Sequence, residues 1–268
     1  MQYTQLSRRS AGGSKIDWEK QYLTFIPVED AVFSWAERAT SGHLEYSVNG
    51  GQTWVTIADG DSTPTIMAGS KVVWRGDLMP HIGTGEETAG IGCFSSTGNY
   101  KAYGNIMSLL FYDNYYKSQL NNSLRCAFFL LFRRNGIITP PLFPATELSN
   151  YCYYGTFEYC QFLSEAPTLP ALVLASNCYR KMFMGTAITA ITLPATTPQS
   201  YSYRAMLQSC SNLVYIKCLL TSLGDNVTYI WTRYVGASGT FVKAAGMEDW
   251  AAGPSGIPSG WTVVDDNS

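Results

Sequence analysis

Three stretches in the second half of the chain align with one another: PATELSNYCYYGTFEYC at residues 144–160, PALVLASNCYRKMFMGT at 170–186 and PATTPQSYSYRAMLQSC at 194–210. Their first residues, Pro144, Pro170 and Pro194, are 26 and then 24 positions apart. Three more columns follow nearly the same spacing: Phe132, Phe157, Phe183 and Leu207; Cys152, Cys178 and Ser202; Cys160, Thr186 and Cys210. Four columns with one spacing series indicate a structural repeat, and a period of about 20–29 residues is typical of leucine-rich repeats.

Each repeat predicts a short extended piece followed by a turn and a helical or 3₁₀ piece. The extended pieces are represented by residues 163–169 and 188–193, and the helical piece by residues 176–183. One repeat cannot bury its apolar face alone, so stacked repeats should form a common core. We therefore expect a solenoid of three to four leucine-rich repeats over residues 106–218. The columns dissolve after Cys218, which predicts a C-terminal cap over 219–268.

The first half of the chain has a different pattern. Short alternating apolar runs fill residues 22–105, and the turn Asn49-Gly50-Gly51 between two such runs is the strongest hairpin signal. No helical period is sustained there, so we predict an all-β, sandwich-like domain of roughly seven short strands. Residues 1–21 are polar and broken by Gly12-Gly13-Ser14, which is typical of an anchoring arm. The predicted fold is therefore mixed, with a β-domain followed by a solenoid.

Composition narrows the classes of function. Charged residues make up 14% of the 268 residues, and the formal net charge is −2, which disfavours nucleic acid as a partner because that binding is driven by basic charge. The longest apolar run, at residues 126–132, is far shorter than the ~20 residues that span a bilayer. We therefore expect neither a nucleic-acid partner nor a membrane span.

The seven cysteines form an odd set without any C-x-x-C pair. With only His43 and His81 besides, no zinc spacing can be assembled. Aligned positions of neighbouring repeats should lie about 4.8 Å apart, so a disulfide between Cys152 and Cys178 is geometrically conceivable. The next position in that column is Ser202, which favours free thiols. No metal and no cofactor is predicted.

The repeats resemble the surface leucine-rich repeats of gut Bacteroidales bacteria and their phages, whose unit is similar to LPATTLxxxCYxxMFxGCxxLxxAPE. The closing segment SGTFVK…GPSGIPSGWTV, at residues 238–263, resembles the tail that follows those repeats. The segments YLTF, VEDAVFSW, LEYSVNGGQTWVTI, AGSKVVWRGD and GNIMSLLFYDN resemble the β-domain that precedes them. The resemblance spans roughly residues 22–264. It implies adhesion or surface display rather than catalysis.

This resemblance leads to a hypothesis about location. No apolar region follows Arg8 and Arg9 as it would in a secretion signal, so we expect assembly in the host cytoplasm and display on a phage virion, as a fibre or decoration protein. The arm would dock to virion proteins, with Arg8, Arg9 and Trp18 as anchoring residues. The alternative is a bacterial cell-surface adhesin. By analogy with phage fibres, we expect a homo-oligomer, namely a trimer.

Three short motifs suggest other chemistry and are each better explained as turns. Ser47 to Trp54 resembles the Asp box of sialidases, which is a structural hairpin turn. A glycoside hydrolase needs two positioned carboxylates, and no pair stands out, so this function is the least favoured. Arg75-Gly76-Asp77 matches the integrin tripeptide, and Asp59-Gly60-Asp61-Ser62 could offer oxygens to calcium. Both are ordinary turn sequences.

Tyrosine and arginine recur in the repeats and are the candidate ligand-binding residues for a host glycan or surface protein. Both residue types are favoured at binding hot spots and beneath sugar rings. The competing interpretation is that the rings pack between successive turns. The candidate set is Tyr153, Tyr154, Tyr179, Arg180, Tyr203 and Arg204.

Overall fold

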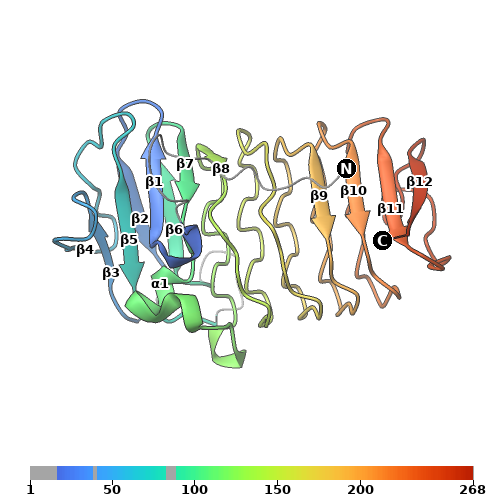
Figure 1. The fold of residues 1–268 in the computed structure, drawn as a ribbon, viewed down its shortest axis with the longest axis horizontal. Coiled ribbons are helices and arrows are strands. Elements are labelled where there is room, and N and C mark those ends of the chain that lie inside the picture. The colour runs from blue at the N-terminus through green and yellow to red at the C-terminus, as the bar shows by residue number, and fades with distance from the viewer. Residues whose placement is uncertain (1–16, 39–40, 83–88, 268) are drawn as a thin grey trace.

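The computed structural model describes residues 17–38, 41–82 and 89–267. An N-terminal β-sheet region is followed along the long axis of the molecule by a parallel β-solenoid with a repeat of about 25 residues (Figure 1). Helix is almost absent. In the described ranges it is confined to α1 (Ser108–Phe111) and three 3₁₀ segments, η1 (Trp18–Lys20), η2 (Tyr112–Lys117) and η3 (Asn122–Leu124).

Among its described residues, the N-terminal region contains seven strands, where roughly seven were expected: β1 (Leu23–Pro27), β2 (Phe33–Glu37), β3 (Leu44–Ser47), β4 (Val55–Ile57), β5 (Val72–Gly76), β6 (Gly92–Ser96) and β7 (Tyr100–Tyr103). A larger sheet has the order β4-β3-β5-β1-β7-β8, with β8 at Ile137–Thr139, and β2 pairs separately with β6. The Phe25 ring of β1 lies 5.2 Å from that of Phe33 and 5.1 Å from that of Phe94. These contacts place the two sheets face to face.

The predicted hairpin at Asn49-Gly50-Gly51 is confirmed, because β3 and β4 pair antiparallel on either side of it. Gly50 and Gly51 have φ of 73° and 89°, a region that L-residues rarely adopt. The Ser47 hydroxyl accepts from Gly51 N at 2.9 Å, and Asn49 Oδ1 accepts from Thr53 N at 3.0 Å. The Asp-box-like sequence is therefore a self-bonded turn.

The strands of the solenoid form one parallel sheet in chain order: β9 (Ala190–Leu193), β10 (Tyr215–Cys218), β11 (Thr240–Ala244) and β12 (Thr262–Asp266). Tyr215 is in register with Ala190 on one side and Thr240 on the other. The sheet therefore continues beyond Cys218, and residues 219–268 add further coils to the stack in addition to closing it.

The prediction of a helical or 3₁₀ piece in each repeat is wrong. Its place is taken by five stacked turn segments, at residues 126–134, 151–159, 177–185, 201–209 and 226–234, in which every fourth residue has positive φ. In the second segment these are Tyr151, Gly155 and Tyr159, with φ of 61°, 56° and 60°. A right-handed helix cannot contain such residues at regular intervals.

Backbone hydrogen bonds explain this conformation. Tyr153 N donates to Cys178 O in the next turn segment at 3.0 Å, and Gly155 N donates to Arg180 O at 2.8 Å. The intervening Tyr154 N bonds within its own segment, to Tyr151 O at 3.2 Å. Alternate amides thus bond between coils and within a coil, so the turn segments form a hydrogen-bonded layer without being strands.

The four-residue period also divides the side chains. In the second segment Cys152, Tyr153, Thr156 and Phe157 point inward and are buried at 0–1% exposure. The pairs between them, residues 154–155 and 158–159, point outward. A pattern of i, i+1, i+4 and i+5 is close to the 3.6-residue period of an amphipathic helix, which is why the sequence pattern suggested a helix.

The N-terminal region and the solenoid share one core. The Phe94 ring of β6 stacks on Phe132 of the first turn segment, with centroids 5.9 Å apart and planes at 15°. Strand β8 joins the larger sheet beside β7, in parallel. The first coil is therefore covered by the β-sheet region, which shields its apolar end as terminal caps do in repeat proteins.

We expect Ser209→Gly to stabilise the protein by about 0.5–1 kcal/mol, since Ser209 has φ of 63° and this conformation costs an L-residue roughly 1 kcal/mol or more. The aligned position one coil earlier is already a glycine, Gly185, with φ of 72°. Denaturant unfolding measures the change. Ser211→Gly is the matched control, because Ser211 is exposed and lacks positive φ. Equal effects of the two substitutions would contradict the assignment of strain.

Candidate functional site

The inward tyrosines of the repeats form a continuous stack. Tyr153 and Tyr179 lie 5.8 Å apart with planes at 5°, and Tyr179 and Tyr203 lie 6.1 Å apart at 17°. Phe128 extends the stack at one end and Trp231 followed by Trp250 at the other. Each of the three tyrosines is 1% exposed. The prediction that Tyr153, Tyr179 and Tyr203 contact a ligand is therefore wrong, because their rings fill the interior between coils.

A second inward column contains Phe132, Phe157 and Phe183, stacked at 5.5 Å and 5.7 Å. Beside it, small polar side chains donate to backbone carbonyls of the preceding coil. Cys160 Sγ donates to Phe132 O at 2.7 Å and Cys210 Sγ to Phe183 O at 3.0 Å. These bonds explain why the column accepts only small donors.

All seven cysteines are free thiols. Burial raises the pKa of Cys160, Cys178 and Cys218 to about 12, against 9.0 for an ordinary thiol. A raised pKa lowers the thiolate fraction at neutral pH, and the thiolate is the reactive form. Cys152 is buried with its pKa also raised well above the ordinary value by burial, and no disulfide joins it to Cys178.

The outward positions of the turn segments are where the remaining candidates lie. Tyr154 is 3% exposed, because Phe129 stacks on one face of its ring at 4.4 Å and the Arg180 guanidinium lies 5.2 Å from its centroid. Arg180 and Arg204 are half-buried at the surface. The structure thus keeps the two arginines as surface candidates and places Tyr154 beneath one of them.

Four more outward basic residues join them and were missed by the sequence analysis: Arg133, Arg134, Lys181 and Arg233. Each of these residues lies in an outward pair of the four-residue period. This position is the signal in the sequence that identifies them, and the prediction of a helix hid it. We call these six residues the basic turn face. Glu158 is the single carboxylate in the five segments; it is 2% exposed and lies 2.8 Å from Arg133 Nε and 3.7 Å from Lys181 Nζ.

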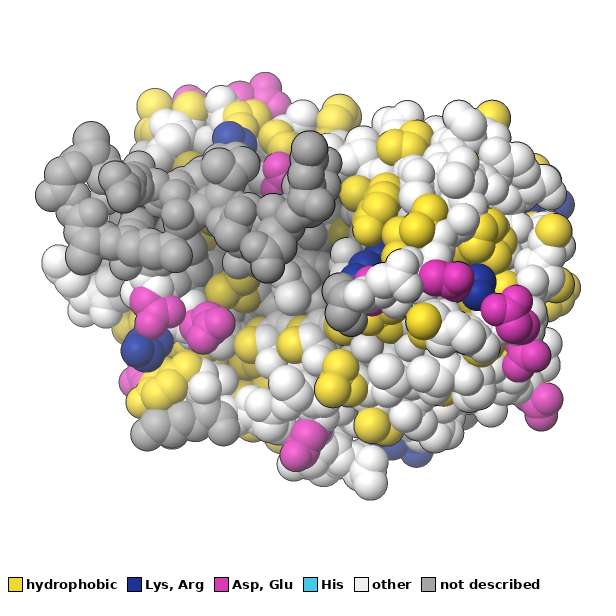
Figure 2. Space-filling model, turned by 45° about the vertical axis from the view of Figure 1, so that its right-hand side comes forward, with side chains coloured by type: hydrophobic (Ala, Val, Ile, Leu, Met, Phe, Trp, Pro, Cys, Tyr) yellow, Lys and Arg dark blue, Asp and Glu magenta, His cyan; other side chains and the backbone are white. Residues whose placement is uncertain are grey.

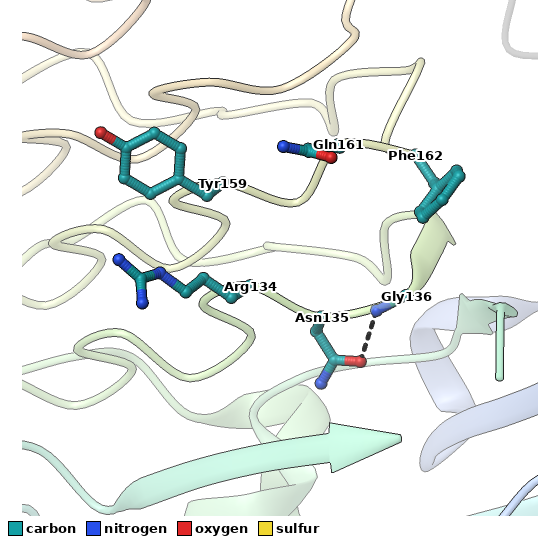
Figure 3. A pocket seen from close by; sticks show the side chains of 6 residues that line it. All are labelled: Arg134, Asn135, Gly136, Tyr159, Gln161 and Phe162. Carbon is teal, nitrogen blue, oxygen red and sulfur yellow. Dashed lines mark hydrogen bonds between the residues drawn. The ribbon is translucent and has the colours of Figure 1, made fainter. Parts of the chain in front are cut away.

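A hollow of about 440 Å³ lies at one edge of this face, lined by Arg134, Asn135, Gly136, Tyr159, Gln161 and Phe162. Figure 3 shows the Arg134 and Tyr159 side chains extending side by side, away from Phe162. Asn135 is held in place, since its Oδ1 accepts from Gly136 N at 2.7 Å and from Ser96 Oγ at 2.8 Å. The hollow thus presents one cation, two aromatic rings and the Gln161 amide.

The N-terminal motifs are structural. Arg75 of the integrin-like tripeptide lies 2.8 Å from Glu45, 3.3 Å from Asp113 and 4.0 Å from the centre of the Trp54 ring. Burial and the neighbouring Asp113 raise the pKa of Tyr22, whose hydroxyl donates to that carboxylate. Arg75 is therefore the centre of a packed cluster rather than an exposed loop.

The two aspartates of the calcium-like turn accept backbone amides. Asp59 Oδ1 accepts from Glu37 N at 2.9 Å and Asp61 Oδ2 from Ala58 N at 3.1 Å. His43 lies in a different part of the β-region, with Nδ1 3.8 Å from Asp77 Oδ1. Within the described ranges, no group of three or more His, Cys, Asp or Glu residues is placed to hold a metal ion.

Arg8 and Arg9 lie outside the described residues, and the backbone of Trp18 belongs to η1. No helix in the part of the chain that the structure covers is both long and apolar enough to cross a bilayer. Comparison with known proteins finds no matching family model, curated protein or solved structure.

Tyr179→Ala should lower the free energy of unfolding by about 3–5 kcal/mol, as large-to-small changes at buried rings do. The matched control is Tyr153→Phe. It removes only a buried hydroxyl that has no hydrogen-bond partner in the part of the chain that the structure describes, so it should be neutral or slightly stabilising. Denaturant unfolding of both variants measures the two changes in the free energy of unfolding. A loss below about 1 kcal/mol for Tyr179→Ala would mean that the ring stack is not structural.

Alkylation should separate the buried thiols from the single half-exposed one, Cys93. At pH 8 the folded protein should take up iodoacetamide at Cys93 alone, whereas all seven thiols should react in denaturant, as intact mass would show.

Because folding raises the pKa of the buried thiols above 9.0, their contribution to the free energy of unfolding is complete below about pH 9 and is lost as the pH rises toward 12. Rapid native labelling of Cys152 or Cys178 would contradict this account.

Proposed function

We propose that the protein is a non-enzymatic adhesion module displayed on a surface, with a phage particle as its site of display and a host glycan or surface protein as its ligand. The observation that carries the proposal is the separation of roles within each coil. Inward pairs build the main core, and several outward pairs carry arginine, lysine and tyrosine at the surface.

The resemblance to surface leucine-rich repeats of Bacteroidales and their phages supports the same function. A bacterial cell-surface adhesin would use the same face, so the two placements differ only in what the N-terminal arm binds. The hollow beside Arg134 has no carboxylate among the described residues that line it, and Glu45 and Asp113 both bind Arg75. These contacts favour binding over glycoside hydrolysis. A homotrimer remains our expectation by analogy with phage fibres.

Deleting residues 1–16 tests the anchoring role of the arm. The deletion stops there because Asn105 donates to Glu19 O and Gln21 O, so residues 19–21 belong to the folded body. The shortened protein should melt as the full chain does and bind Bacteroidales cells equally well, but should no longer co-sediment with phage particles. Replacement of Arg8 and Arg9 by Gln in the full chain is the finer variant.

Co-sedimentation of the shortened protein at the level of the full chain would refute the anchoring role. Absence of cell binding by either form would refute adhesion itself. Hydrolysis of a host polysaccharide that disappears when one carboxylate is replaced would establish an enzyme instead.

A further inference from the structure

The five turn segments are strongly basic in a chain whose net charge is slightly negative. They contain six of the 18 Lys and Arg residues but one of the 20 Asp and Glu residues. That one carboxylate, Glu158, is buried and paired with Arg133 and Lys181. The turn face therefore carries a concentrated positive charge that the composition of the whole chain conceals.

Four of the six cations have no carboxylate among the described residues within ion-pair distance. Each guanidinium instead lies over a tyrosine ring: Arg134 is 5.7 Å from the centre of Tyr159, Arg180 5.2 Å from Tyr154, Arg204 5.0 Å from Tyr229 and Arg233 4.7 Å from Tyr234. Such contacts hold a guanidinium flat against the surface while leaving its charge uncompensated.

The parallel-sheet side of the solenoid is different. Lys217 Nζ lies 2.8 Å from Asp266, and Lys243 Nζ lies 2.7 Å from Asp265 and 3.1 Å from Glu248. Figure 2 shows dark blue side chains next to magenta ones toward the right-hand end of the face that it presents. Uncompensated cations are therefore a feature of the turn segments rather than of the solenoid surface in general.

The coil spacing sets the distance between the backbone positions that carry Arg180 and Arg204. Lys181 N donates to Arg204 O at 3.0 Å, so Arg180 and Lys181 lie one coil from Arg204, about 4.8 Å away along the stack. A hexose unit advances a polysaccharide chain by a similar distance. Exposed rings flank the cations, with Tyr229 45% and Tyr234 64% exposed. Rings of this kind pack against the apolar faces of sugars.

We propose that the basic turn face binds an acidic polysaccharide, with the arginines pairing with carboxylate or sulfate groups on successive sugars and the exposed tyrosines packing against the rings. The proposal rests on the adhesion function and names its ligand class and face. A polysaccharide fits the spacing of the coils, because the advance of one hexose along such a chain is close to the distance between neighbouring coils.

The test measures binding of the full chain to polygalacturonate and, as a matched uncharged chain, to carboxyl-reduced polygalacturonate. Dextran sulfate, neutral dextran and single-stranded DNA complete the set. We expect binding to the two acidic polysaccharides, weakening as salt rises, and none to the neutral ones.

The variant Arg180→Gln with Arg204→Gln should weaken binding by about tenfold or more, since each arginine would lose a charge-assisted hydrogen bond. The matched control removes two cations elsewhere, Lys20→Gln with Lys71→Gln, both exposed, and should leave binding nearly unchanged. If the Gln variant melts early, Arg180→Lys with Arg204→Lys keeps the charge and should give intermediate affinity through loss of the planar fork.

Equal binding of the carboxyl-reduced chain, or unaltered binding by both arginine variants, would overturn the proposal. Tighter binding of single-stranded DNA than of either acidic polysaccharide would assign the face to nucleic acid instead. If the protein adheres to cells but binds no acidic polysaccharide, the ligand assignment fails while the adhesion function stands. Absence of adhesion as well would remove both.

Discussion

The alternating hydrogen bonds of the turn segments are the constraint on which the rest of the molecule depends. Every second amide donates to the next coil and the others close turns within their own coil. This alternation requires positive φ at every fourth residue, and most of these positions are occupied by residues other than glycine, such as Tyr151, Lys181 and Ile230. The conformational cost at each is offset by the bonds between coils and by the core that they align. A single turn segment is therefore not stable without its neighbours in the stack.

Because the coils stay in register, identical positions meet and their side chains must be compatible with copies of themselves. Flat rings satisfy this condition, and the Tyr153, Tyr179 and Tyr203 rings stack nearly parallel. Large aromatics close the inner stacks: Phe94 from the β-sheet region lies at the first end of the phenylalanine column, and Trp250, after the last turn segment, lies at the far end of the tyrosine stack. The Trp231 indole also donates to Gly256 O at 2.8 Å, which ties the closing segment to the core.

The repeat, its columns and the hairpin at Asn49 could be predicted from the sequence because each is a direct consequence of spacing or of turn chemistry. The conformation of the turn segments could not, because a four-residue period with paired inward positions is too close to that of a helix. The continuation of the stack beyond Cys218 was hidden for another reason. Thr228 and Thr232 stand where Tyr203 and Leu207 stand one coil earlier, and Trp231 fills the space between coils instead.

The site residues follow the same division. Tyr179 and Arg180 are neighbours in sequence, yet one is buried and the other lies at the surface. Composition alone favours both as binding residues, and only the phase of the four-residue period separates them. Arg134, Lys181 and Arg233 share the outward phase with Arg180, so a search for phase rather than for residue type would have found them.

The direction of the hydrogen bonds between coils also determines how the molecule responds to force. These bonds run along the axis of the stack, so a pull along that axis is borne by the bonds of every coil in series. The coil with the weakest set opens first and releases about 25 residues, roughly 80–90 Å of extended chain, before the next coil is strained. If the protein acts as the adhesion module proposed above, it would lengthen stepwise under flow and dissipate the force, rather than transmit it undiminished to the bond with its ligand.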